Sequence, residues 1–195
     1  DLNLQRPIIN EKENNLICLS SIKELNFIKI LKQNMVLGGA VTIENFLDSV
    51  RSKMPELIEI LQRFGSPQIR NQGTIGGNLC TSSPIGDLAP LLMVLNSDIN
   101  VFGKNGIKKT NINNFFKGYR KNILKKDEIV LSIEIPYPNK KNKIFSWKLS
   151  KRYDQDISTI SLAINIQTQK NIIKEIQMAA GGVAITQKRL DKLCK

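Results

Sequence analysis

The residues best suited to chemistry gather between positions 68 and 87, where three of the four glycines stand close together among small polar side chains: Gly73, Gly76 and Gly77. Because glycine lacks a Cβ, the backbone N–H groups of this stretch can approach a bound ligand closely. The hydroxyl of Thr74 and the amide of Asn78 add hydrogen-bonding groups, and Asp87 supplies an acceptor for a ribose or an adenine edge. The pattern favours a loop that cradles a diphosphate. A plain glycine-rich turn between two helices fits the same spacing.

Composition excludes several other kinds of active site. The 195 residues contain no His, so this chain can form neither a Ser-His-Asp or Cys-His nucleophile nor a His-ligated metal site. The cysteines Cys18, Cys80 and Cys194 are too dispersed for a zinc or iron-sulfur pattern and indicate reduced thiols. The glycine segment matches neither GxGxxG nor a Walker loop. Those classes of active site are therefore excluded, we predict no metal ligand, and we expect Cys80 to be a small buried residue.

The formal net charge of +12 raises the alternative of a basic nucleic-acid-binding protein without a redox role. The basic residues are mostly Lys and are spread along the whole chain, while aromatic residues make up only 6%. A solvated Lys-rich surface is therefore the favoured interpretation, with no nucleic-acid partner. The longest apolar run, 88–95, is far shorter than the roughly 20 residues of a membrane span. With no readable signal peptide, we expect a cytoplasmic piece of a longer polypeptide.

The first half of the chain predicts short strands and helices that would position the glycine segment. Residues 15–19 form an apolar run suited to a strand, and a helix-capping box follows at 21–24. Two strands over 28–31 and 35–37 are separated by a hairpin-like turn. Thr42 caps a predicted helix, and a second helix begins at Pro55 and ends near Phe64.

Beyond the glycine segment, Pro84 is placed to open a helix that runs through Leu95, with Ser82 or Ser83 as its cap. A hairpin over 98–110, a short helix at 113–116 and a strand over 128–135 follow. The polar, proline-bearing stretch 136–143 is a candidate domain boundary. After it, four apolar residues alternate with small or polar ones, which predicts a half-buried strand within an antiparallel meander: Ile160, Leu162, Ile164 and Ile166.

Three stretches together make a family recognisable. The segment from Phe64 to Leu88 closely resembles the flavin-binding segment of the molybdenum hydroxylase family. The stretches 115–136 and 148–158 are similar to the FAD-binding small subunits of bacterial xanthine dehydrogenases. The similarity runs in order over essentially the whole chain.

This resemblance implies an α+β fold. Residues 1–138 would be the second part of a vanillyl-alcohol-oxidase-like FAD-binding domain, without its N-terminal pyrophosphate loop. Residues 144–195 would begin an antiparallel-sheet C-terminal flavoprotein domain. The first flavin-binding loop is expected before Asp1, and an iron-sulfur domain further upstream.

The resemblance also assigns the cofactor-binding residues by position: Phe64, Thr74, Ile75, Gly76, Gly77, Asn78, Asp87, Val130 and Lys148. Val130 stands where the family usually has Leu and would keep an apolar wall. Lys148 could place a positive charge near an anionic reduced flavin ring. The charged stretch 151–156 would lie close to the flavin and affect how NAD approaches, whereas its residues alone indicate an exposed turn.

The implied activity is oxidation of purines such as xanthine or hypoxanthine. Electrons would pass from a molybdopterin cofactor in a large subunit through 2Fe-2S clusters to FAD in this chain, and then to NAD. In such an enzyme the protein positions and tunes the flavin, which performs the chemistry, so the resemblance implies no catalytic side chain in this chain. The FAD subunit of a carbon monoxide, nicotinate or aromatic acyl-CoA dehydrogenase is the alternative within the same family.

Overall fold

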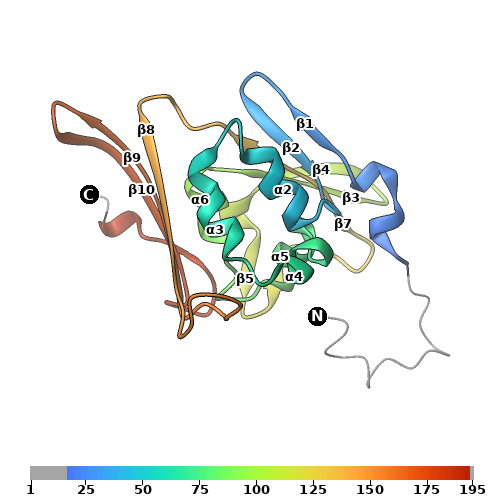
Figure 1. The fold of residues 1–195 in the computed structure, drawn as a ribbon. Helices are drawn as coiled ribbons and strands as arrows, with labels where there is room; N and C mark the ends of the chain where they lie inside the picture. Colours follow the sequence, from blue (N-terminus) through green and yellow to red (C-terminus); the bar gives the residue numbers. More distant parts are fainter. Residues whose placement is uncertain (1–16, 194–195) are drawn as a thin grey trace.

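The computed structural model describes residues 17–193, which form helices and two main antiparallel sheets (Figure 1). The first sheet has the strand order β1-β2-β7-β3-β4. Its strands are β1 (Ile28–Ile30), β2 (Asn34–Gly38), β3 (Asp98–Gly103), β4 (Gly106–Asn111) and β7 (Ile129–Pro136). The last strand inserts between the two hairpins that the sequence predicted. Both hairpins and the strand at the end of this half are confirmed.

Five short helices follow one another between β2 and β3: α2 (Ile43–Val50), α3 (Ile58–Gln62), α4 (Pro67–Gln72), α5 (Ile75–Thr81) and α6 (Leu88–Val94). Thr42 caps α2 as predicted, because its hydroxyl accepts a hydrogen bond from the backbone N–H of Asn45 at 3.2 Å. Pro55 opens a 3-10 turn, Pro55–Leu57, that continues into α3. Every residue of the apolar helix α6 is buried, since it packs against the strands Ile160–Gln169 and Ile172–Gly181.

The second sheet has the order β11-β10-β9-β8, with β8 (Asn142–Leu149), β9 (Ile160–Gln169), β10 (Ile172–Gly181) and β11 (Lys188–Arg189). The predicted antiparallel meander is confirmed. The alternation in β9 is also present, but its apolar row is not the buried one. Ser161, Ala163 and Asn165 are buried, and Ile160 is exposed. Small residues occupy the inner face because α6 packs closely against it, and Asn165 donates a hydrogen bond to the carbonyl of Val94.

The remaining elements are short. A two-stranded ribbon joins β5 (Phe116–Gly118) and β6 (Lys121–Asn122). The other 3-10 turns are η2 (Leu19–Ser21), η3 (Lys23–Leu25), η5 (Ile112–Asn114) and η6 (Asp191–Leu193). The short helix expected at 113–116 is thus a 3-10 turn that begins one residue earlier. In residues 17–193, no helix is long and apolar enough to cross a membrane.

Two predictions near the start of the chain are wrong where the structure describes them. The strand expected over 15–19 is a 3-10 turn from residue 19, and residues 15 and 16 lie outside the described part. The capping box does not form, because Ile22, which has no capping side chain, precedes the turn Lys23–Leu25. In this region Leu25 is buried and its backbone lies against Gly38 at the end of β2, whereas Ile17 and Leu19 are exposed.

The glycine segment differs most from its prediction. Residues 75–81 form the helix α5 instead of an open loop, and the helix expected from Pro84 begins only at Leu88. The helix α5 stops at Ser82, which adopts a left-handed conformation with φ of 50°. Ser83 closes a tight turn, since its carbonyl accepts from the backbone N–H of Gly86 at 3.1 Å. Neither serine is therefore available as a cap for α6.

Candidate functional site

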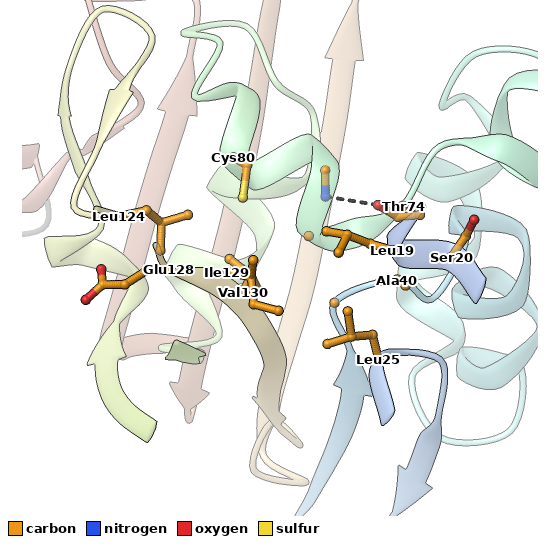
Figure 2. Close-up of a pocket in the computed structure, with 13 residues that line it drawn as sticks. Leu19, Ser20, Leu25, Ala40, Thr74, Cys80, Leu124, Glu128, Ile129 and Val130 are labelled. Atoms are coloured by element: carbon orange, nitrogen blue, oxygen red, sulfur yellow. Dashed lines mark hydrogen bonds between the residues drawn. The ribbon is translucent and has the colours of Figure 1, made fainter. Parts of the chain in front are cut away.

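A crevice of about 340 Å³ opens where the start of α5 faces β7 and the end of β2 (Figure 2). Its size lies at the lower end of the range typical of small-molecule sites. Most of its walls are apolar or glycine. The lining residues are Leu19, Ser20, Leu25, Gly39, Ala40, Thr74, Gly76, Gly77, Cys80, Leu124, Glu128, Ile129 and Val130.

The first turn of α5 forms one wall of this crevice, and its backbone N–H groups are already bonded within the protein. The N–H groups of Ile75 and Gly76 donate to the carbonyls of Val41 and Gly39, both at 3.0 Å. The hydroxyl of Thr74 accepts from the N–H of Gly77 at 3.0 Å, as a helix cap. The predicted cradle of free N–H groups is therefore wrong, because the glycines belong to a helix that satisfies them.

The glycines instead allow three backbone segments to approach one another. A Cβ on Gly76 would lie 2.5 Å from the carbonyl oxygen of Gly39, and a Cβ on Gly39 would lie 2.1 Å from that of Val130. Gly77 differs, since a Cβ there would meet only the hydroxyl of its own capping residue. Gly76 and Gly39 thus hold the wall together, whereas Gly77 keeps the crevice open.

The crevice contains little charge. Glu128 is its one charged side chain, and no Lys or Arg lines it among the described residues. The carboxylate of Glu128 accepts hydrogen bonds from Nζ of Lys108 at 2.7 and 2.8 Å and from the backbone N–H of Lys125 at 2.9 Å. The bond from Lys108 lowers the pKa of the Glu128 carboxyl. A diphosphate would meet no positive charge here, whereas an uncharged planar ring suits the apolar walls.

The thiol of Cys80 faces this crevice from α5 (Figure 2). Burial raises the pKa of the Cys80 thiol to about 11, because the surroundings disfavour the thiolate. The side chain is therefore a neutral, polarisable wall at neutral pH.

The predicted cofactor residues divide into two groups. Thr74, Gly76, Gly77 and Val130 come together around the crevice. Five others do not line it: Phe64, Ile75, Asn78, Asp87 and Lys148.

Three of these five residues, Phe64, Ile75 and Asn78, belong to the helical segment between β2 and β3. Phe64 packs against the hydrophobic core, and Ile75 is fully buried within it. Asn78 carries a buried Oδ1 without a hydrogen-bond partner, beside the 83–86 turn. Such a group can accept a hydrogen bond from a ligand or from water.

Asp87, which precedes α6, and Lys148, on β8, instead form an ion pair with each other. Nζ of Lys148 lies 2.8 Å from Oδ2 of Asp87, and the two side chains are 2% and 9% exposed. Ser158 donates a hydrogen bond to the other oxygen of Asp87. Lys148 also donates to the carbonyl of Arg63 at 3.1 Å. Both charges are thus paired inside the protein.

Sequence reasoning missed the contributions of Gly39 and Ala40 to the crevice. The pair Gly38–Gly39 was visible as the end of a strand, but its approach to α5 depends on tertiary packing. Arg63 was also missed, because an arginine at the end of a short helix gives no signal of its own.

The structure thus combines an α+β body, an antiparallel sheet and an apolar crevice at the start of a glycine-containing helix. These features fit a domain that binds a small molecule with a planar ring. Family models agree with this class. Residues 6–138 match the FAD binding domain in molybdopterin dehydrogenase, and residues 145–195 match the C-terminal domain of the CO dehydrogenase flavoprotein. The chain belongs to the family of molybdopterin dehydrogenase FAD-binding domains.

Individual relatives fit the same family. The chain is 31% identical to the xanthine dehydrogenase/oxidase of Gallus gallus over 188 residues and to the xanthine dehydrogenase of Oryza sativa subsp. japonica over 193 residues. These matches cover 89% and 91% of this chain but only 14% of each relative. The carbon monoxide dehydrogenase structure from Hydrogenophaga pseudoflava superposes with a TM-score of 0.82 and 26% identity, over 86% of this chain and 59% of that one. The α+β fold implied by the resemblance is therefore confirmed.

FAD is accordingly the cofactor of this domain, and the crevice fits part of it. The wall around Gly77, Cys80 and Val130 is apolar and open, as a flavin ring requires. The unpartnered Oδ1 of Asn78 offers an acceptor near the same helix.

Proposed function

We propose that this chain is the FAD-carrying part of a xanthine dehydrogenase-like molybdenum hydroxylase. It would work with a large subunit that holds the molybdenum cofactor and with an upstream domain that holds 2Fe-2S clusters, in the cytoplasm. Two domains, 1–138 and 144–195, would share the flavin. The similarity to two xanthine dehydrogenases over nine-tenths of the chain supports this proposal.

The observation that carries the proposal is the crevice between α5 and β7. Its residues would hold the flavin ring by contact, with Val130 and Cys80 as apolar walls and Gly77 leaving room for the ring. Thr74 caps α5 with its oxygen, and its hydroxyl proton can be donated to a ligand. These walls exclude water from the ring and so protect reduced flavin from side reactions.

When bound, FAD would accept electrons from the iron-sulfur clusters and pass them as hydride to NAD. This chain's residues would position the flavin ring, exclude water from it and surround it with uncharged groups, and none would act as nucleophile or general acid. The carboxylate of Glu128, at one edge of the crevice, is neutralised by its ion pair with Lys108.

Titration with FAD tests the cofactor site. Gly77→Leu should weaken FAD binding at least tenfold, because the new side chain enters the crevice. Gly118→Leu is the matched control, since a Cβ at Gly118 meets nothing within 4 Å. Flavin fluorescence and equilibrium dialysis report binding. Equal FAD affinity in both variants would contradict the site.

The carbon monoxide dehydrogenases are the second candidate, since one of them is a solved structural relative at 26% identity. Assembly of the chain with its partner subunits decides between the two. NADH formation with xanthine supports the proposal, and turnover of carbon monoxide without purine activity would refute it. A chain that gains no flavin but binds DNA in a salt-sensitive way would support the nucleic-acid alternative.

A further inference from the structure

The chain between β8 and β9 crosses from the second sheet to the ends of two helices of the first domain. We call residues 150–157 the strap. Most of the strap is exposed, and Tyr153 and Ile157 are 67% and 70% exposed. The strap contains no helix or strand of its own. A segment with this exposure needs specific anchors to keep one conformation.

Arg63, at the end of α3, supplies such an anchor from 85 to 90 residues away in sequence. Its Nη1 donates to the carbonyl of Lys148 at 2.6 Å, and its Nη2 donates to the hydroxyl of Ser150 at 3.2 Å. Nη2 and Nε both donate to the carbonyl of Tyr153, at 3.2 and 3.3 Å. The guanidinium also lies over the ring of Tyr153, 4.4 Å from its centroid. One planar group therefore fixes three points of the chain.

The anchor is reciprocal. Lys148 returns a hydrogen bond from its Nζ to the carbonyl of Arg63, and the same Nζ forms the buried ion pair with Asp87 at the start of α6. Ser158, just after the strap, donates to that carboxylate as well. The strap is thus tied at one end by Arg63 and at the other by Asp87. While both ties hold, the ammonium of Lys148 stays out of water.

We propose that Arg63 is a positioning residue that holds the strap closed and thereby seats Lys148 on Asp87. Without the guanidinium, the carbonyls of Lys148 and Tyr153 lose a charged donor, and the local contacts within the strap are left to hold it. Those contacts are the hydroxyl of Ser150 donating to the carbonyl of Arg152 and the backbone N–H of Arg152 donating to Asp156. The strap then opens more often and exposes Lys148.

This inference extends the proposed function, because Asp87 and Lys148 are among the predicted cofactor residues. Its test nevertheless uses the chain without flavin. A failure of Arg63 to hold the strap is therefore distinguishable from a failure of the chain to bind FAD.

Two reporters on the intact chain measure opening of the strap. Trypsin should cut after Lys151 or Arg152 faster when the strap leaves its docked position, because a protease binds a locally unfolded segment more readily than an anchored one. Acetylation followed by mass spectrometry reports access to Lys148, with the exposed Lys140 as reference. Cleavage after Lys104, in the turn between β3 and β4, reports general loss of stability and normalises the strap signal.

Arg63→Met should raise normalised strap cleavage and acetylation of Lys148 at least tenfold. Arg63→Lys keeps a charged donor without the planar fork, so it should give an intermediate rate. Arg51→Met is the matched control, since Arg51 pairs with an exposed Asp48 on the surface of α2. Tyr153→Ala removes the exposed ring that lies against the guanidinium of Arg63 without disturbing the core, and it should raise strap cleavage about threefold even if the Arg63 variants fold poorly. Rates equal to those of Arg51→Met in both Arg63→Met and Tyr153→Ala would overturn the proposal.

Discussion

Alanine substitutions at two adjacent glycines should have different consequences: Gly76→Ala should lower the stability of the fold, and Gly77→Ala should mainly weaken FAD binding. At Gly76 a new Cβ would lie 2.5 Å from the carbonyl oxygen of Gly39, whereas ordinary van der Waals contact begins at 3.4 Å. The backbones must therefore separate by roughly 0.9 Å, the difference between these two distances. Gly39 cannot yield easily, because it is itself packed against the carbonyl of Val130 and bonded to the carbonyl of Leu131 at 2.8 Å.

The expected magnitude follows from three contributions. Overpacking of a well-packed contact costs about 1–3 kcal/mol. Loss of the hydrogen bond from the N–H of Gly76 to the carbonyl of Gly39 adds about 1 kcal/mol. Replacement of glycine by alanine in a helix returns about 1 kcal/mol. Gly76→Ala should therefore destabilise the protein by about 2 kcal/mol, which corresponds to a fall in Tm of about 4–8 °C for a chain of this size.

Gly77→Ala is the matched comparison within the same helical turn. Its Cβ meets only the hydroxyl of Thr74, so partial loss of that cap offsets the gain in helix propensity. The free energy of unfolding should change by less than about 1 kcal/mol. FAD affinity should nevertheless fall, because the new methyl group occupies the crevice. Urea unfolding followed by circular dichroism measures the stability, and flavin fluorescence measures the binding. Equal unfolding midpoints for the two variants would refute the packing argument.

Two further predictions concern buried groups. Lys148→Met should destabilise the protein by about 3–5 kcal/mol, because it leaves the Asp87 carboxylate buried beside only the Ser158 hydroxyl. Combining Lys148→Met with Asp87→Asn should recover part of this loss, as measured by urea unfolding. Additive effects of the two substitutions would contradict the pairing. Alkylation should discriminate between thiols as pH rises. The hydrogen bond with Ser20 lowers the pKa of the exposed Cys18, so it should react first, while burial keeps Cys80 protonated until pH approaches its pKa of about 11. Peptide mapping distinguishes the two thiols, and equal rates at pH 8 would contradict this order.

The amino-acid sequence by itself determined the features that depend on neighbouring residues. The cap at Thr42, the two hairpins of the first sheet and the meander of the second follow from local patterns, and the structure confirms them. The segment from Phe64 to Leu88 also identified the family, since its order of small and polar residues is specific.

Some local patterns were misleading because packing decided between two permitted outcomes. In β9 the alternation fixed which residues share a face, but the helix α6 decided that the small row, and not the Ile row, lies inward. In the glycine segment, Thr74 could begin either a loop or a helix. The hydrogen bonds to Val41 and Gly39 selected the helix.

Only the tertiary structure decided how distant residues meet at the candidate site. The crevice requires β2, α5 and β7 to converge, and the Asp87–Lys148 pair joins positions 61 residues apart. No periodicity or spacing encodes such a contact, because it arises only when elements far apart in the sequence pack together. The residue types were readable from the chain, but their partners were set by long-range burial, where a charge that leaves water must find an opposite charge within the fold.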